Sequence, residues 1–240
     1  MIANIESYKD PEIKVLKSEL HRLEMLLGEL TNENLELEKM LSEFQHRHTI
    51  ELGEIILELL NLRKIKFKDD KVRYEETEND ERQYHEQVNT EKTKEVYELT
   101  EVQKAELKKK FRKATLLCHP DKVSDEFKTN AEAIFIKLKT TYELNDLGKV
   151  TDILANLEKG GFKTRSESVS EKDLLKLAIT NLQSQVNVLK TEIVTIRQSD
   201  TYTTIIEIDN WDEYFIRTKE ELQQELEDLN KEIKTVFNST

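Results

Sequence analysis

The chain has 240 residues, a formal net charge of -12, 36% charged and 37% hydrophobic residues, and only 5 Gly and 2 Pro. These values exclude a single large globular core and leave few interruptions to helical periodicity, so we expect an all-α protein of about two domains. A single cysteine excludes an intrachain disulfide, and without a signal-peptide core or an apolar run of about 18 residues we expect a cytoplasmic protein with no membrane span.

Residues 1–66 carry the heptad pattern of a coiled coil. Apolar side chains occupy most first and fourth positions of a seven-residue repeat: Ile13, Leu16, Leu20, Leu23, Leu27, Leu30, Leu37, Leu41 and Phe44. A parallel homodimer would place Glu19 opposite Glu24, and the same repulsion would recur at Glu33. We therefore expect this helix to pack against helices of its own chain or against a different partner, with an oligomer of another geometry as the alternative.

A charged, helical connector at residues 67–99 leads into a basic helix. Thr100 and Gln103 have the spacing of a capping box, which predicts that the basic helix starts there. Residues 104–122 contain seven Lys and Arg against two acidic residues, and this local reversal of charge indicates an acidic counterpart. The opposite face of the helix is an apolar stripe of Leu107, Phe111, Ala114 and Cys118.

The basic helix is expected to end where the chain reads His119, Pro120, Asp121. Proline disfavours helical geometry in the residue before it, so the histidine and the aspartate are predicted to flank a rigid residue at an exposed turn. A second apolar stripe follows at Ala131, Phe135, Leu138 and Tyr142. Its spacing predicts another helix, antiparallel to the first and packed against it. A third helix is expected from about Gly148 to Lys159.

Residues 100–161 resemble the J domain of the DnaJ family of co-chaperones, in which a basic second helix ends in a His-Pro-Asp loop. The matching positions are Glu106, Leu107, Lys108, Lys109, Phe111, Arg112, Lys113 and Ala114 before the loop, and Ala131, Glu132, Phe135, Leu138, Tyr142 and Glu143 after it. Between two matching helices the tripeptide becomes a specific signal. In the family, the first helix ends in a turn that contains glycine. No such turn precedes Thr100 in this chain, so a first helix would have to come from residues 79–99. The helix at 148–159 replaces the family's basic fourth helix.

The resemblance implies a protein that acts on a partner ATPase and has no catalytic, cofactor-binding or metal-binding residues of its own. A J domain docks on a heat-shock 70 chaperone of the DnaK type and accelerates its ATP hydrolysis. On this analogy His119, Pro120 and Asp121 bind the chaperone, with the carboxylate paired to an arginine. The basic residues that would meet an acidic surface of the same partner are Lys108, Lys109, Arg112, Lys113 and Lys122.

Residues 173–240 are predicted to form an antiparallel helical hairpin, joined to the J-like module by a polar linker at 162–172. Its two apolar stripes are Leu175, Ala178, Leu182, Val186, Leu189, Ile193 and Ile196, and Leu222, Leu226, Leu229, Ile233 and Val236. Apolar residues between Tyr202 and Phe215 are expected to close the tip of this hairpin as a small core. If the protein engages a client, this tip is the first candidate surface after the loop.

Two functions fit this pattern. The first is a co-chaperone whose J-like module stimulates a DnaK-type ATPase while the coiled coils select an unidentified client or scaffold protein. The second is a coiled-coil scaffold or adaptor in which the J-like pair is only a structural unit. The complete His-Pro-Asp triplet and the basic face favour the first function. Nucleic-acid binding is not expected from an acidic chain with a pI of about 5.1.

Overall fold

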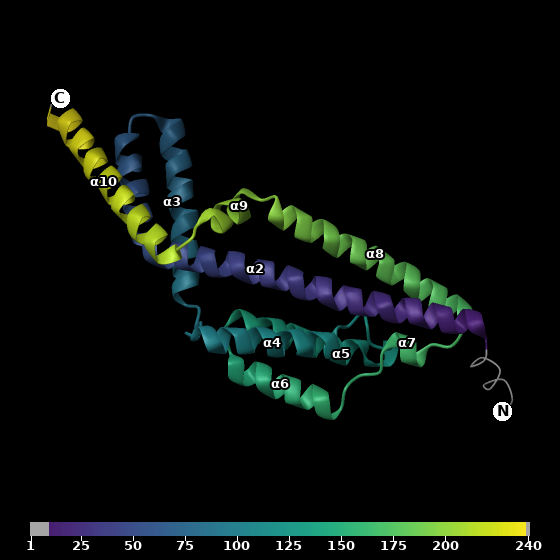
Figure 1. Ribbon diagram of the computed structural model, residues 1–240. Coiled ribbons are helices and arrows are strands. Elements are labelled where there is room, and N and C mark those ends of the chain that lie inside the picture. The colour runs from purple at the N-terminus through teal and green to yellow at the C-terminus, as the bar shows by residue number, and fades with distance from the viewer. Residues whose placement is uncertain (1–9, 239–240) are drawn as a thin grey trace. The chain divides into compact units, whose positions relative to one another are not determined.

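The computed structural model describes residues 10–238, and this part of the chain is all-α, as predicted (Figure 1). Its helices are α2 (Pro11–Lys66), α3 (Lys71–Lys92), α4 (Glu101–Cys118), α5 (Lys128–Glu143), α6 (Leu147–Lys159), α7 (Arg165–Ser168), α8 (Lys172–Arg197), α9 (Asp200–Glu207) and α10 (Trp211–Asn238). The short 3-10 turn η2 (Asp125–Phe127) precedes α5. No described helix is long and apolar enough to cross a membrane.

The chain forms two compact units, which are described separately. Among the described residues, the first unit combines 10–39 with 95–198, and the second combines 40–94 with 199–238. Helix α2 contributes to both units, its N-terminal half to the first and its C-terminal half to the second. The heptad pattern of the sequence predicted a long helix in this region, but it gave no signal that two different sets of partners divide it.

Helices α4, α5 and α6 form the core of the first unit. The capping box predicted at Thr100 and Gln103 is present, and α4 starts directly after it. Phe111 stacks on Tyr142 with ring centroids 3.8 Å apart, and His119 meets Phe135 at 5.2 Å. The later residue of the first helix thus contacts the earlier residue of the second, so α4 and α5 are antiparallel, as expected.

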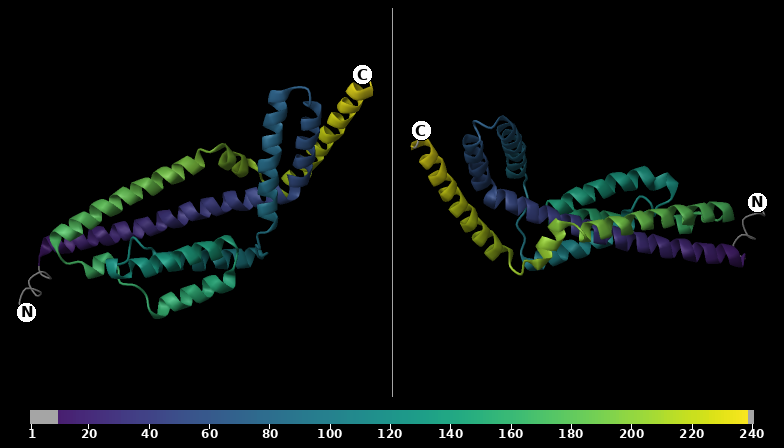
Figure 2. Two further views of the ribbon diagram at one scale, coloured as in Figure 1. Left: turned by 180° about the vertical axis from the view of Figure 1, so that it is seen from behind. Right: turned by 90° about the horizontal axis from the view of Figure 1, so that it is seen from above.

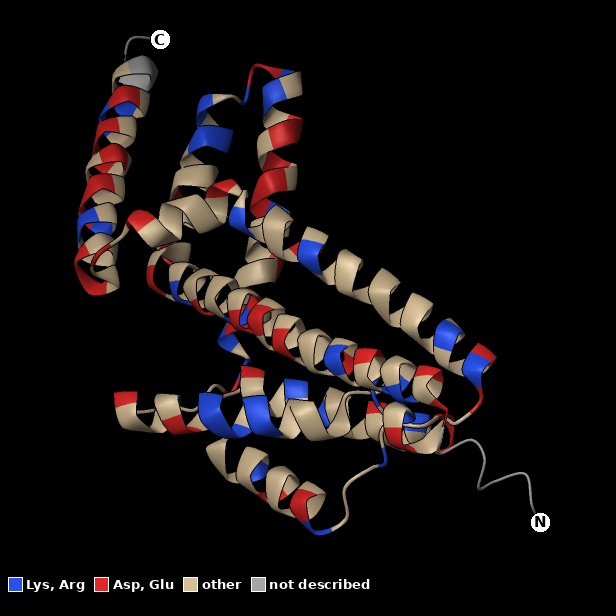
Figure 3. Cartoon of the chain, turned by 45° about the vertical axis from the view of Figure 1, so that its right-hand side comes forward, with Lys and Arg blue, Asp and Glu red and all other residues tan. Residues whose placement is uncertain are grey.

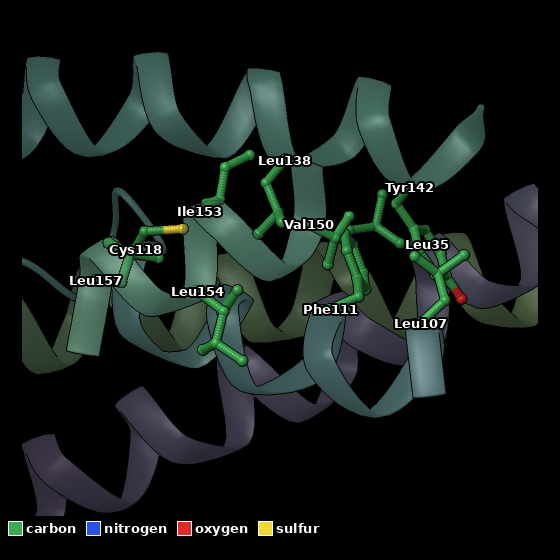
Figure 4. Close-up of a cluster of buried hydrophobic side chains, with 11 residues drawn as sticks. Leu35, Leu107, Phe111, Cys118, Leu138, Tyr142, Val150, Ile153, Leu154 and Leu157 are labelled. Carbon is green, nitrogen blue, oxygen red and sulfur yellow. The ribbon is translucent and has the colours of Figure 1, made fainter. Parts of the chain in front are cut away.

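Helix α6 completes this core by covering α4 and α5 with one apolar face. Its buried residues are Val150, Ile153, Leu154 and Leu157. Figure 4 shows Phe111, Tyr142 and Val150 pointing toward one another. The side chain of Asp146 accepts a hydrogen bond from the backbone of Lys149 and caps α6 at its start. The helix expected from about residue 148 to 159 is thus confirmed.

The J-like helix expected between residues 79 and 99 is not part of this core. Helix α3 belongs to the second unit, where Val88 is buried against α2 beside Gly53. Residues 94–100 form no helix. They approach the core as an extended segment, in which the backbone amide of Tyr97 donates to the carbonyl oxygen of Leu144 over 3.0 Å. This part of the family pattern is therefore absent.

Within the first unit, the heptad seam of α2 packs against α8 of the same chain. The cluster that the two helices share contains Ile13, Leu20, Leu23, Leu27, Leu175, Ala178, Ile179, Leu182 and Val186, all buried. Figures 1 and 2 both show α8 alongside the N-terminal half of α2. Of the partners considered for the coiled-coil seam, a helix of its own chain is the one observed.

In the second unit, the apolar residues that follow α8 pack on α2. Phe44 and Leu52 of α2 share a buried cluster with Ile205 of α9 and Phe215 of α10. Helix α10 is also joined to α2 by an ion pair of 2.6 Å between Arg63 and Glu225. The single hairpin predicted over residues 173–240 is therefore corrected, because its two long helices belong to different units and each packs on α2.

Candidate protein-binding site

The His-Pro-Asp loop begins where α4 ends. His119 is extended, with φ -62° and ψ 122°, as expected for a residue that precedes proline. The backbone amide of Lys122 donates to the carbonyl oxygen of His119 over 3.0 Å and closes a tight turn. Inside this turn, the backbone amide of Asp121 donates to Nδ1 of the imidazole over 3.2 Å.

The imidazole of His119 is buried, and this corrects the expectation of an exposed turn. Only 7% of the residue is accessible. Its Nε2 lies 3.1 Å from Oγ1 of Thr31 on α2. Because the amide of Asp121 can only donate, Nδ1 must accept, so the proton of the neutral ring is on Nε2 and is donated to Thr31.

These surroundings lower the pKa of His119 to about 4. Burial is the main cause, since the charged ring would lose its hydration. Lys122 lowers the pKa further, and the carboxylate of Asp121 opposes both effects. The hydrogen bonds also favour the neutral ring, because a proton on Nδ1 would point at the backbone N–H of Asp121.

The loop lies beside a cleft of about 400 Å³ formed by α2, α5 and α8. Residues that line it include Thr31, Leu35, His119, Pro120, Asp121, Phe135, Lys139, Val188 and Glu192. The side chain of Asp121 is 26% exposed, and its carboxylate lies 3.8 Å from the ammonium group of Lys128. Of the histidine and the aspartate, the aspartate is thus the more accessible.

Two of the predicted basic residues are paired with α2. Glu36, whose side chain is 16% exposed, accepts from Lys108 at 2.9 Å and from Nη2 of Arg112 at 2.7 Å. Burial alone would raise the pKa of Glu36, but these hydrogen bonds outweigh it and lower the pKa. Figure 3 shows blue residues gathered on α4 and red residues along the N-terminal half of α2.

Of the other three basic residues, two are exposed and one is buried. Lys113 pairs with Glu158 of α6, and Lys109 lies on the exposed face of α4. Lys122, predicted to bind a partner, is instead buried, and its ammonium group donates to the carbonyl oxygen of Leu116 over 3.0 Å. Burial lowers the pKa of Lys122, and Glu24 opposes this shift. In this arrangement Lys122 belongs to the packing of the loop.

A second stripe of α2 contacts the J-like module, and the sequence did not reveal it. Its members are Gly28, Thr31, Leu35 and Lys39, which lie next to the heptad seam around the helix. Glu24, one turn earlier, accepts hydrogen bonds from the backbone amide and the hydroxyl of Ser166 in the linker. Because most of them are polar or small, hydrophobic periodicity could not identify them. The one available signal was Gly28, since glycine inside a helix costs about 1 kcal/mol relative to alanine and therefore indicates a close approach.

Comparison with known proteins finds no match to this chain. No protein-family model, curated protein or solved structure matches the chain. Among the described residues, no group of three His, Cys, Asp or Glu side chains is arranged to hold a metal ion.

Proposed function

We propose that the chain is a J-type co-chaperone that docks on a DnaK-type heat-shock 70 chaperone and stimulates its ATP hydrolysis. One observation carries the proposal: His119, Pro120 and Asp121 close the turn between a basic helix and the antiparallel helix that packs on it. The paired rings of Phe111 and Tyr142 hold these helices together. The loop is therefore presented on a rigid support, which a transient docking surface requires.

In this proposal the residues of the site have different roles. Asp121 offers a carboxylate to an arginine of the chaperone, an interaction that is stronger when it is charge-assisted. Lys109 and the other cations of α4 attract the acidic surface of the partner and orient it, each pair contributing about 0.2 to 1 kcal/mol. His119 and Pro120 set the shape of the loop rather than supplying charge.

The test is single-turnover ATP hydrolysis by a DnaK-type chaperone of the same organism, measured with the intact chain. We expect stimulation that Asp121→Asn and His119→Gln both abolish. Asp121→Asn is the sharper variant, because it keeps the backbone amide that binds His119 and so leaves the loop geometry unchanged. Stimulation that survives both substitutions would reject the loop as the docking site.

The burial of His119 favours a second candidate function, a coiled-coil scaffold or adaptor. A histidine that is 7% accessible and bonded to Thr31 has the surroundings of a packing residue. An adaptor would leave the chaperone at its basal rate, both as the wild-type chain and as a variant whose α2 contacts are removed. The same assay therefore separates the two functions.

A further inference from the structure

We propose that α2 is an internal cover of the chaperone-binding site, which must move aside before the loop and the basic helix can dock. The cover consists of Gly28, Thr31, Leu35, Glu36 and Lys39. This inference rests on the proposed co-chaperone function. It adds regulation to the site: the free chain is held in a closed form that a partner or a change in conditions opens.

The first contact of the cover occupies the histidine of the loop. Thr31 accepts from Nε2 of His119 over 3.1 Å, and the amide of Asp121 already occupies Nδ1. Both nitrogens of the ring are therefore satisfied within the chain. A chaperone that needs His119 has to displace Thr31 first, and its surface cannot reach a side chain that is 7% accessible.

The second contact occupies the basic face. Glu36 binds both Lys108 and Arg112, the latter through two hydrogen bonds to its carboxylate. A glutamate on α2 thus stands where the resemblance places the acidic surface of the chaperone. The cover and the chaperone would compete for the same cations.

The third contact lies at the far end of α5. The ammonium group of Lys39 donates to the carbonyl oxygen of Tyr142 at 2.9 Å and to Oδ1 of Asn145 at 2.6 Å. It also lies 4.9 Å from the centre of the Tyr142 ring. A cation at this position satisfies a carbonyl in the last turn of the helix. Leu35 is buried in the core cluster between this contact and the loop.

The cover fits closely at Gly28. A Cβ placed on this residue would lie 2.5 Å from Cδ2 of Leu116 on α4. A side chain here would therefore require the side chain of Leu116 to shift. The glycine lets the two helices approach closely beside the start of the loop.

The contacts of the cover are mostly polar, which makes it releasable. Ion pairs that remain partly exposed contribute little each and are weakened by salt. The apolar seam of α2 faces α8 instead and would stay buried when the cover moves. Opening exposes Leu35 and the side chain of Leu116 that packs on Gly28, and α2 keeps the partner that stabilises it as a helix.

The experiment combines two substitutions in the full-length chain, Thr31→Val and Glu36→Gln, with Glu29→Gln as the matched control. Glu29 is exposed on the same helix. We expect hydrogen exchange of the amides in residues 116–124 to accelerate about tenfold in the double variant, since one hydrogen bond and one ion-pair cluster are lost. We also expect the double variant to stimulate the chaperone at a concentration several-fold lower than the wild type or the control.

The outcomes separate the two proposals. If hydrogen exchange of residues 116–124 in the double variant stays at the wild-type rate, the proposal that α2 covers the loop is wrong. Faster exchange with stimulation unchanged from the wild type would overturn its role in limiting access. Faster exchange with no stimulation by any variant would instead contradict the co-chaperone function, while the cover would stand as a contact of the fold.

A reversible crosslink tests the same inference from the other side. A Cβ at Gly28 would lie 3.8 Å from Cγ of Leu116, so the pair Gly28→Cys and Leu116→Cys brings two thiols close together, and formation of the disulfide is checked first by titration of free thiols. Cys118→Ala removes the only native thiol. The oxidised chain is expected to lose stimulation, and reduction is expected to restore it. Equal stimulation by the two forms would show that docking needs no opening.

Discussion

His119 is satisfied on both ring nitrogens, and this sets how the closed form responds to protons. The neutral ring donates through Nε2 to Thr31 and accepts through Nδ1 from Asp121. The protonated ring has two donors and loses the second bond. Other charges also face the region: Asp121 and Lys122 on the loop, and Glu38, Lys139 and Glu192 from the helices around the cleft. Protonation of His119 therefore destabilises the closed form.

The first prediction is that acid opens the cover. In the closed form the pKa of His119 is lowered from 6.5 to about 4, so at pH values well above 6.5 the ring is neutral in both forms and does not affect the equilibrium. As the pH falls toward 4, the open form takes up a proton and the closed form does not. Between pH 7.5 and 5 the ratio of open to closed chains should rise about thirtyfold. Hydrogen exchange of residues 116–124, corrected for intrinsic rates, measures this change.

The control for this prediction is His119→Gln, which removes the titrating ring. Its open fraction should vary much less over the same pH range. If this variant keeps the full dependence, protonation of His119 is not what opens the cover.

Among the helices, capping and apolar periodicity made α4, α5 and α6 predictable. Thr100 specified the start of α4, and Pro120 specified its end. The cover could not be predicted, because its contacts depend on which face of α2 meets a module that lies far away in sequence. His119 was placed at the right turn but with the wrong exposure, since a loop motif carries no information about what packs on it.

The pairing of α4 and α5 gives a prediction about stability. Leu138 is fully buried in their shared core, whereas Ile136 on the same helix is 59% exposed. Leu138→Ala should lower the free energy of unfolding by about 2 to 5 kcal/mol through lost contacts and a cavity. Ile136→Ala should change it by less than about 0.5 kcal/mol. Denaturant titration followed by circular dichroism compares them, and similar losses would contradict the packing described for α5.

At the scale of the whole molecule, α2 is the element that both units share. The sequence predicted a long helix here, but assigned the apolar residues after α8 to a hairpin tip instead of to α2. Those residues would be removed from water whether they closed a hairpin or covered Phe44, so composition did not distinguish the two outcomes. Partner choice among amphipathic helices depends on complementary shape, which a single sequence does not show.

The division into units predicts that damage to one core stays local. Leu52 is fully buried in the second unit, and Ile50, also on α2, is 42% exposed. Leu52→Ala should speed hydrogen exchange in α3, α9 and α10 and leave α4, α5 and α6 unchanged. Ile50→Ala serves as the control. Equal acceleration in α4 would mean that the two cores unfold as one.

The bond between Thr31 and His119 joins residues separated by 88 positions, and this has a consequence for the order of folding. The contacts among α4, α5 and α6 are closer in sequence, so they form with a smaller loss of chain entropy. We therefore expect a refolding chain to complete the His-Pro-Asp turn before α2 reaches it. Each newly made copy would then pass through a stage in which its turn is formed and accessible, before the long-range contact closes over it.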